Sequence, residues 1–84
     1  MAKQFAEPQP IKVTPSINGV PVNLVRNGRR EKVVAIYQRW RAADRWWGEE
    51  VERDYFMVRT STGLVCDIFR DATTKQWYLS KIHD

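Results

Sequence analysis

Short runs in which apolar and polar residues alternate cover most of the chain, and turn residues separate them. Alternation with a period of two predicts half-buried β-strands. The predicted strands are residues 11–14, 20–25, 30–41, 51–60, 64–70 and 76–82. Residues 1–10 contain Pro8 and Pro10 and show no periodicity. They are therefore predicted to form a flexible N-terminal arm ahead of a single β-barrel-like domain over residues 11–84.

The clearest turn signal is Asn27-Gly28, because both residues tolerate the positive φ angles of a type I′ turn. A two-residue loop here sets the register of a hairpin. The register pairs Arg26 with Arg29, Leu24 with Glu31, Val22 with Val33 and Val20 with Ala35. Pro21 cannot donate a ladder hydrogen bond, which favours an edge position for its strand.

Residues 30–41 carry apolar side chains on both faces of the predicted strand, and an α-helix is the competing interpretation. The β-branched residues and the preceding hairpin turn favour a strand. Ala42-Ala43-Asp44 is predicted to turn the chain after it. Consecutive strands with tight turns predict an all-β fold, a small antiparallel meander curled into an SH3-like or half-open barrel of about six strands.

Three of the four tryptophans, Trp40, Trp46 and Trp47, lie within eight residues. In so short a chain, these large side chains either anchor the core or form a binding surface. Trp40, Trp46 and Trp77 are expected in the core, with arginines stacked over them. Neighbours in a strand point to opposite faces, so one of Trp46 and Trp47 faces outward, and Trp47 is the favoured contact residue.

Charge is distributed unevenly along the 84 residues, whose net charge is +4. Residues 1–45 hold nine Lys and Arg against three Asp and Glu, and residues 46–84 hold five against seven. The basic half predicts an acidic protein surface or a polyanion as partner, unless its cations only solvate a small sheet. The predicted contact residues are the cations of the hairpin tip and the tryptophan-rich stretch, with one indole: Arg26, Arg29, Arg30, Lys32, Arg39, Arg41, Arg45 and Trp47.

Two modes of contact suit these residues. Arg26 opposite Arg29 brings like charges together at the hairpin tip, a cost that a bound anion would offset. Basic hairpin tips can track phosphates, and exposed aromatic side chains beside arginines can stack on unpaired bases.

Catalytic and metal chemistry finds little support. Cys66 and His83 are the only cysteine and histidine, so a four-ligand zinc site is excluded, and neither a metal nor a cofactor is predicted. A Cys–His nucleophile pair stays formally open, but Cys66 lies mid-strand on an apolar face, where a buried thiol is inert. The acidic run is expected to be solvated and to face nearby arginines, rather than to serve acid–base or metal chemistry. It comprises Glu49, Glu50, Glu52 and Asp54. No catalytic residue and no small-molecule substrate are predicted.

A single cysteine allows no internal disulfide, which favours a cytoplasmic protein. The N-terminus has no apolar signal-peptide region, and no apolar run has the length of a membrane span. The chain is expected to be a monomer or weak homodimer without membrane contacts.

Four short motifs in the C-terminal half carry a resemblance. They are Asp44-Arg45-Trp46-Trp47, Glu52-Arg53-Asp54-Tyr55-Phe56, Ile68-Phe69-Arg70-Asp71 and Trp77-Tyr78-Leu79. In this order they resemble a small bacterial domain family that looks like the C-terminal tail of ImuB, the inactive Y-family DNA polymerase homologue of damage-tolerance mutasomes. The resemblance covers residues 40–84 and leaves residues 11–39 outside.

The resemblance implies a non-enzymatic interaction module, accessory to bacterial DNA repair and translesion synthesis through protein contacts. The implied partner is a protein of the DNA damage-tolerance machinery. Direct binding of nucleic acid through a basic, tryptophan-containing face is the alternative.

Overall fold

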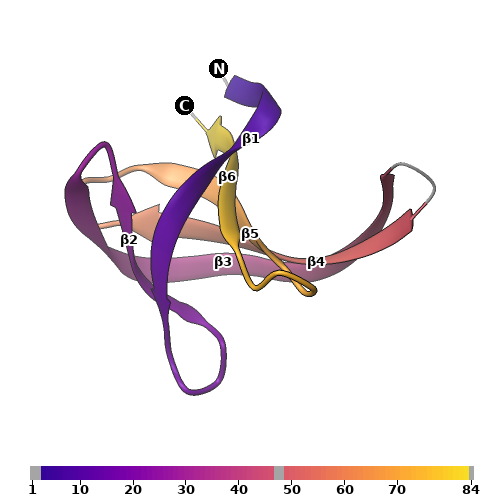
Figure 1. The fold of residues 1–84 in the computed structure, drawn as a ribbon. Helices are drawn as coiled ribbons and strands as arrows, with labels where there is room; N and C mark the ends of the chain where they lie inside the picture. Colours follow the sequence, from indigo (N-terminus) through magenta and orange to yellow (C-terminus); the bar gives the residue numbers. More distant parts are fainter. Residues whose placement is uncertain (1–2, 47–48, 84) are drawn as a thin grey trace.

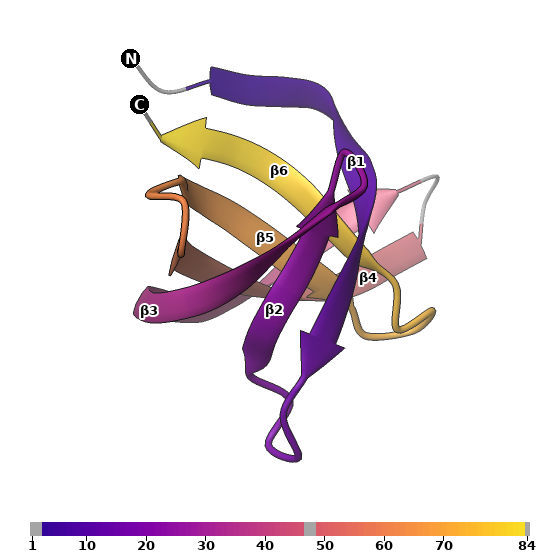
Figure 2. The ribbon, with the colours of Figure 1, turned by 90° about the vertical axis from the view of Figure 1, so that its left-hand side faces the viewer.

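The computed structural model describes residues 3–46 and 49–83, and every element in these ranges is a β-strand. The strands are β1 (Lys3–Pro15), β2 (Pro21–Arg26), β3 (Arg29–Trp46), β4 (Glu49–Thr60), β5 (Val65–Asp71) and β6 (Trp77–His83). Each strand pairs antiparallel with the next, and β1 also pairs with β6 (Figures 1 and 2). The predicted all-β barrel is thereby confirmed, and residues 30–41 are strand rather than helix.

The barrel closes because the two halves of β1 pair with different strands. Residues 3–11 lie beside β6, and residues 12–15 lie beside β2. The structure thus places residues 3–10 in a strand and not in the predicted flexible arm. The register with β6 is irregular between Gln4 and Gln9, so this stretch tolerates Pro8, which cannot donate a ladder hydrogen bond.

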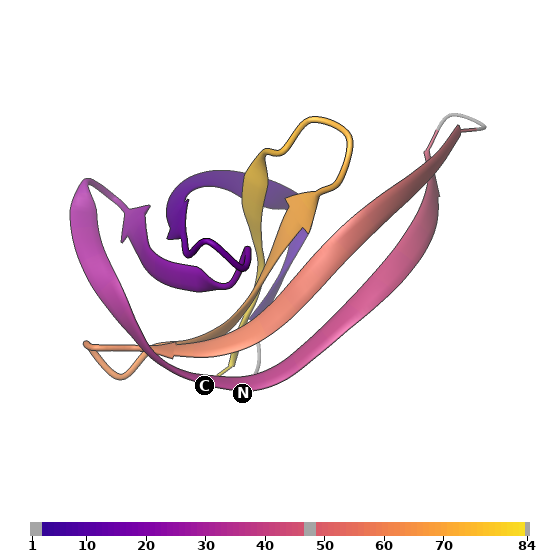
Figure 3. The ribbon, with the colours of Figure 1, turned by 90° about the horizontal axis from the view of Figure 1, so that it is seen from below.

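β3 and β4 continue beyond the barrel as a two-stranded arm, which projects to one side in Figures 1 and 3. β4 pairs with β3 along its whole length but with β5 only from Arg53 onward. The predicted turn at Ala42-Ala43-Asp44 is therefore wrong, since these residues continue β3 opposite Arg53, Glu52 and Val51. Alanine carries no turn chemistry of its own, and the cross-strand partners on β4 keep the backbone extended.

The predicted β2–β3 hairpin is confirmed at its tip. Asn27 and Gly28 have φ angles of 53° and 75°, as a type I′ turn requires. Pairing then runs through Arg26↔Arg29 and Leu24↔Glu31 but stops at Asn23↔Lys32. The predicted pairs Val22–Val33 and Val20–Ala35 do not form. A register irregularity between Val33 and Ala35 kinks β3 at this point, and the two strands part.

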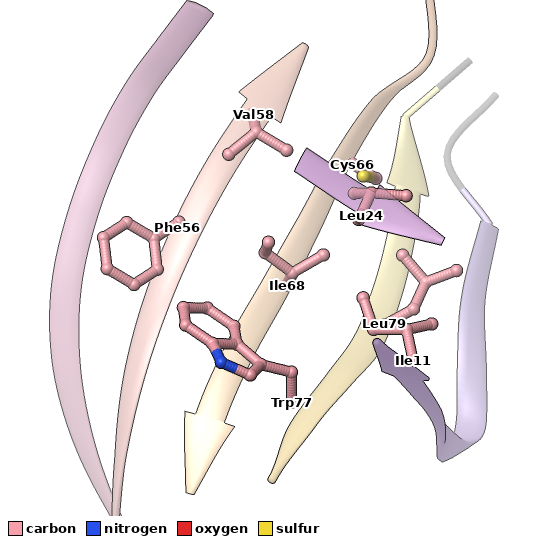
Figure 4. Packing of buried hydrophobic residues seen from close by; sticks show 8 residues of the cluster. All are labelled: Ile11, Leu24, Phe56, Val58, Cys66, Ile68, Trp77 and Leu79. Carbon is pink, nitrogen blue, oxygen red and sulfur yellow. The ribbon is translucent and has the colours of Figure 1, made fainter. Parts of the chain in front are cut away.

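The core fills the barrel with alternate residues of β4, β5 and β6, covered by β1 and β2 (Figure 4). Its members, which share less than a tenth of their surface with solvent, are Ile11, Leu24, Phe56, Val58, Cys66, Ile68, Trp77 and Leu79. Trp77 was predicted here, and its ring lies 5.7 Å from that of Phe56. Trp40 was also predicted here, but it is 37% exposed. The side chain of Trp46, and Trp47 altogether, lie outside the described residues.

One further side chain changes face. Strict alternation along β6 would place Ile82 on the same face as Tyr78, opposite to the face of Leu79. Ile68 pairs with Leu79 while Asp67 pairs with Lys81, so Ser80 is an extra residue in β6. The bulge reverses the alternation, and Ile82 packs against the core.

Candidate functional site

The predicted basic contact residues fall into two groups at opposite ends of the molecule. The first surrounds the β2–β3 turn and comprises Arg26, Arg29, Arg30 and Lys32. The second is on the β3–β4 arm and comprises Arg39 and Arg41. Figures 1 and 3 show the turn and the arm on opposite sides of the barrel. The described members therefore do not form one surface, and the side chain of Arg45 and all of Trp47 lie outside the described residues.

At the β2–β3 turn, a buried carboxylate lies against Arg26. Glu31 is 2% exposed, and its Oε2 lies 3.4 Å from Nε of Arg26. Oε1 of Glu31 accepts hydrogen bonds from the hydroxyls of Thr60, at 2.7 Å, and Thr62. The sequence analysis suggested a bound anion at this hairpin tip. The carboxylate of Glu31 supplies part of that negative charge from within the protein. A shallow depression of about 210 Å³ remains beside it, lined by Arg26, Asn27, Arg29 and Glu31.

The environment of Glu31 favours its charged form. Burial acts to raise the pKa of this carboxyl, but the hydrogen bonds from Thr62 and Thr60 and the charge of Arg26 outweigh it. The pKa of Glu31 is thereby lowered from its ordinary value of 4.5. Glu31 thus joins β3 to the end of β4 through an ionised side chain inside the barrel wall.

Stability is expected to depend on this charge in acid. Because the pKa of Glu31 is lower in the folded state, its contribution is complete above the ordinary value of 4.5 and is lost as the pH falls toward the folded value. Glutamine cannot titrate. Below pH 4.5, the free energy of unfolding of the Glu31→Gln variant should therefore fall less steeply with decreasing pH than that of the wild type. Urea unfolding at a series of pH values measures this, and parallel curves for the two proteins would contradict it.

On the arm, Arg41 is neutralised by the acidic run. Its Nε lies 2.8 Å from Oδ1 of Asp54, and its Nη1 lies 3.9 Å from Oε2 of Glu52. For these two carboxylates, the expected position facing nearby arginines is confirmed, although both lie in β4 rather than in a loop. Arg39 behaves differently, because its guanidinium lies over the ring of Phe56 at 5.3 Å. Among the side chains that the structure describes, no carboxylate forms an ion pair with Arg39.

A row of aromatic rings crosses four strands on the outer face of the sheet. Trp40 stacks on Tyr55, with ring centroids 5.2 Å apart and planes 6° from parallel. Tyr55 lies 5.0 Å from Phe69, which lies 5.1 Å from Tyr78. Phe69 faces outward but is only 2% exposed, because its neighbours and the guanidinium of Arg53, 4.6 Å from its centroid, cover it. The row ends at Trp40 on β3, and the sequence analysis did not predict it.

Four exposed apolar side chains lie within seven positions of β3: Val34, Ile36, Tyr37 and Trp40. Their exposed fractions are 54%, 39%, 52% and 37%. They begin where β2 leaves β3, so along this stretch β4 is the only paired neighbour of β3 among the described strands. We call residues 34–40 of β3, with the side of the backbone that faces away from β4, the β3 edge. It combines apolar surface with backbone groups that have no strand partner.

Cys66 and His83 lie on opposite faces of the sheet. Cys66 points into the core and is fully buried, whereas Nε2 of His83 lies 2.9 Å from Oδ1 of Asp67 on the outer face. The two side chains therefore do not form a nucleophile pair. Burial, with a smaller effect of the Asp67 charge, raises the pKa of the Cys66 thiol to about 12. The predicted inert thiol agrees with this environment.

The Cys66 thiol is expected to resist alkylation until the barrel unfolds. At pH 8 a buried thiol with a pKa of about 12 carries almost no thiolate. Labelling with iodoacetamide should therefore be slow in buffer and complete in urea, and mass spectrometry measures both. Rapid labelling of the folded protein would contradict the assigned burial.

No protein-family model, curated protein or solved structure matches this chain. The residues that carry the resemblance noted above nevertheless have identifiable places in the fold. Phe56, Ile68, Trp77 and Leu79 belong to the core, and Tyr55, Phe69 and Tyr78 form the aromatic row. These motif residues therefore mainly pack the barrel, and the β3 edge lies largely outside them.

Proposed function

We propose that the protein is a non-enzymatic interaction module that binds a protein partner through the β3 edge. The observation that carries this proposal is the group of exposed apolar side chains on one strand, next to a backbone without a strand neighbour. Single exposed apolar residues are common, but here four lie within seven positions of one strand, on both of its faces, beside a backbone edge without a strand neighbour. This density favours an interaction site over scattered exposure. The exposed strand is also an association risk that proteins ordinarily cover.

We place this activity in bacterial DNA damage tolerance. The support is the resemblance to the C-terminal tail of ImuB, whose motif residues build the core and the aromatic row of this fold. The partner proposed is accordingly a protein of the damage-tolerance machinery.

Site-specific cross-linking tests the proposal in host cells before and after DNA damage. A benzophenone amino acid at Tyr37, which is 52% exposed, should yield a cross-linked protein whose amount rises with damage. The same group at Thr73, exposed in the β5–β6 turn, is the matched control and should not capture that protein. Equal capture at both positions, or none at Tyr37, would refute a partner at the β3 edge.

Direct binding of nucleic acid is the second candidate, favoured by the cations around the β2–β3 turn. Arg29, Arg30 and Lys32 are all exposed, and the carboxylate of Glu31 is turned away from solvent. Phosphate contacts of this kind weaken steeply as salt rises, because binding releases counterions.

This candidate predicts that a twenty-nucleotide oligothymidylate binds at low salt and is lost at moderate salt. Combining Arg29→Glu with Arg30→Glu should abolish that binding, because both side chains are solvent-exposed cations, and should leave the thermal unfolding midpoint unchanged. Fluorescence anisotropy and a thermal melt measure the two effects. Affinity that survives the double substitution would remove the β2–β3 turn as the site.

A further inference from the structure

We propose that the β3 edge accepts an extended peptide as an added antiparallel strand, and that the peptide carries an acidic residue next to an aromatic one. This inference rests on the proposed function and specifies the chemistry of the partner. Backbone geometry, the end of the aromatic row and the charge of β3 each support it.

The backbone of β3 is ready for a further strand. β2 occupies its outer side only at residues 29–32, and β4 occupies the other side from Val33 to Trp46. Pairing with β4 is regular from Gln38 to Trp46, so alternate residues there direct N–H and C=O groups away from β4 at the spacing of a β-ladder, whereas Val34 and Tyr37 are extra residues that interrupt it. Figure 3 shows β3 along the outer margin of the arm, with β4 on its inner side. The regular stretch includes Arg39 and Trp40 and is longer than a typical strand of about five to six residues, so an incoming peptide can pair with it.

The aromatic row specifies one position of that peptide. Trp40 covers Tyr55 with one face of its ring, and it is the row's last member because no strand follows β3 there. Side chains directly opposite each other on neighbouring strands come within contact distance. A residue opposite Trp40 would therefore meet the free side of the indole. An aromatic side chain there continues the stacking that already links Trp40, Tyr55 and Phe69.

Charge specifies the neighbouring position. Arg39 precedes Trp40, so its partner in an added strand is adjacent to the aromatic residue. Its guanidinium has only the Phe56 ring as a described partner, whereas Arg41 already has Asp54 and Glu52. A carboxylate opposite Arg39 would form a cross-strand ion pair. Because Arg39 and Trp40 are consecutive in β3, the acidic and aromatic residues opposite them are consecutive in the peptide.

The same charges disfavour the two other occupants of this edge. Residues 34–40 contain Arg39 as their single charged residue and no carboxylate, so pairing this stretch with its counterpart in a second copy would leave Arg39 without a counter-charge. A nucleic-acid strand would carry one charge per nucleotide along an arm on which Glu52 and Asp54 are already present. A peptide needs only one carboxylate at Arg39 and uses the backbone groups that a nucleic acid leaves unpaired.

Selection from a random dodecapeptide phage library on the immobilised full chain tests the inference. The selected peptides should share an adjacent acidic–aromatic pair, and a synthetic copy should protect backbone amides of residues 34–40 from hydrogen exchange. Trp40→Ala should weaken binding at least tenfold. Ile17→Ser is the matched control, because Ile17 is a fully exposed apolar residue in the β1–β2 turn, and it should bind as the wild type does.

N-methylation of the synthetic peptide identifies strand pairing itself. Only alternate peptide residues direct their N–H groups toward β3, so methylating one alternating set should abolish binding and methylating the other should not. Equal tolerance of both sets, selected peptides without the acidic–aromatic pair, or a selection that yields no binders would overturn the inference. Protection of the same amides by oligothymidylate alone, or by self-association, would also overturn it.

Failure of this inference is distinguishable from failure of the proposed function. A partner cross-linked at Tyr37 that does not protect the β3 edge by alternate hydrogen bonds would leave the interaction module in place and remove strand addition. Absence of any specific cross-link at Tyr37 would remove the interaction module together with its proposed ligand.

Discussion

Replacing Trp77 with alanine is expected to lower the free energy of unfolding by about 3–5 kcal/mol. The indole is 5% exposed, packs against Phe56 and lies beside Ile68 in the core (Figure 4). Alanine would leave a cavity that surrounding strands cannot collapse, because β4, β5 and β6 are held by ladders on both sides. In a domain of this size, such a loss lowers the midpoint of thermal unfolding by more than about 10 °C.

Trp40 provides the control for this prediction, since it has the same side chain in a different environment. It is 37% exposed and contacts Tyr55 on the outer face. Trp40→Ala should therefore cost much less stability than Trp77→Ala. Urea unfolding followed by circular dichroism compares the two variants, and equal losses would show that the barrel does not depend on its central indole.

Replacing Glu31 with alanine is expected to lower the free energy of unfolding by about 2–3 kcal/mol. The change removes the acceptor of the Thr60 and Thr62 hydroxyls and the counter-charge of Arg26. The Thr60 hydroxyl, in a residue 1% exposed, and the buried Nε of Arg26 would then lack their carboxylate partner. Leaving a buried polar group without its charged partner costs the desolvation of that group in addition to the lost bond.

Asp54→Ala is the matched control for Glu31→Ala, because it also removes a carboxylate that pairs with an arginine, in this case Arg41 on the β3–β4 arm. The Arg41 side chain is 65% exposed, so solvent screens that pair, and the unfolding midpoint should stay nearly unchanged. Chemical denaturation of both variants makes the comparison. A larger loss for Asp54→Ala would show that the arm, and not the wall of the barrel, holds the critical carboxylate.

The alternating pattern was sufficient to predict an antiparallel meander curled into a small barrel of about six strands, and the Asn27-Gly28 turn set the register at the tip correctly. The pairing of residues 3–11 with β6, which closes the barrel, was not predicted. That register already placed Glu31 opposite the buried Leu24, which was the sequence signal for a carboxylate on the core face. The pattern could not show which hydroxyls donate hydrogen bonds to this buried carboxylate. Thr60 and Thr62 lie on another strand and its turn, about thirty positions along the chain.

The aromatic row also left a signal in the sequence. Tyr55 and Phe69 are equally distant from Thr62, at the centre of one turn, and Phe69 and Tyr78 are equally distant from Thr73-Thr74 in the next. Trp40 and Tyr55 are related in the same way about residues 47–48. The misplaced turn at Ala42-Ala43-Asp44 concealed this symmetry, because folding the chain there sends Trp40 to another partner.

The β3 edge depends on features that no local pattern predicts. Irregularities after Val33 and after Ile36 turn Val34 and Tyr37 out of the alternation, and neither site contains glycine to mark a bulge. These irregularities accompany the curvature that lets one long strand, β3, belong to both the barrel and the arm. Tertiary closure, rather than residue preference, therefore decides which apolar side chains remain exposed.

β2 is joined to each of its neighbours, β1 and β3, by four residue pairs, whereas β3 and β4 share twelve. Amide exchange without full unfolding should therefore start along the two sides of β2, where the ladders are shortest. Glu31 lies on the β2–β3 side, and protonating it would weaken that junction further. The barrel would then open into a curled sheet before the protein unfolds completely.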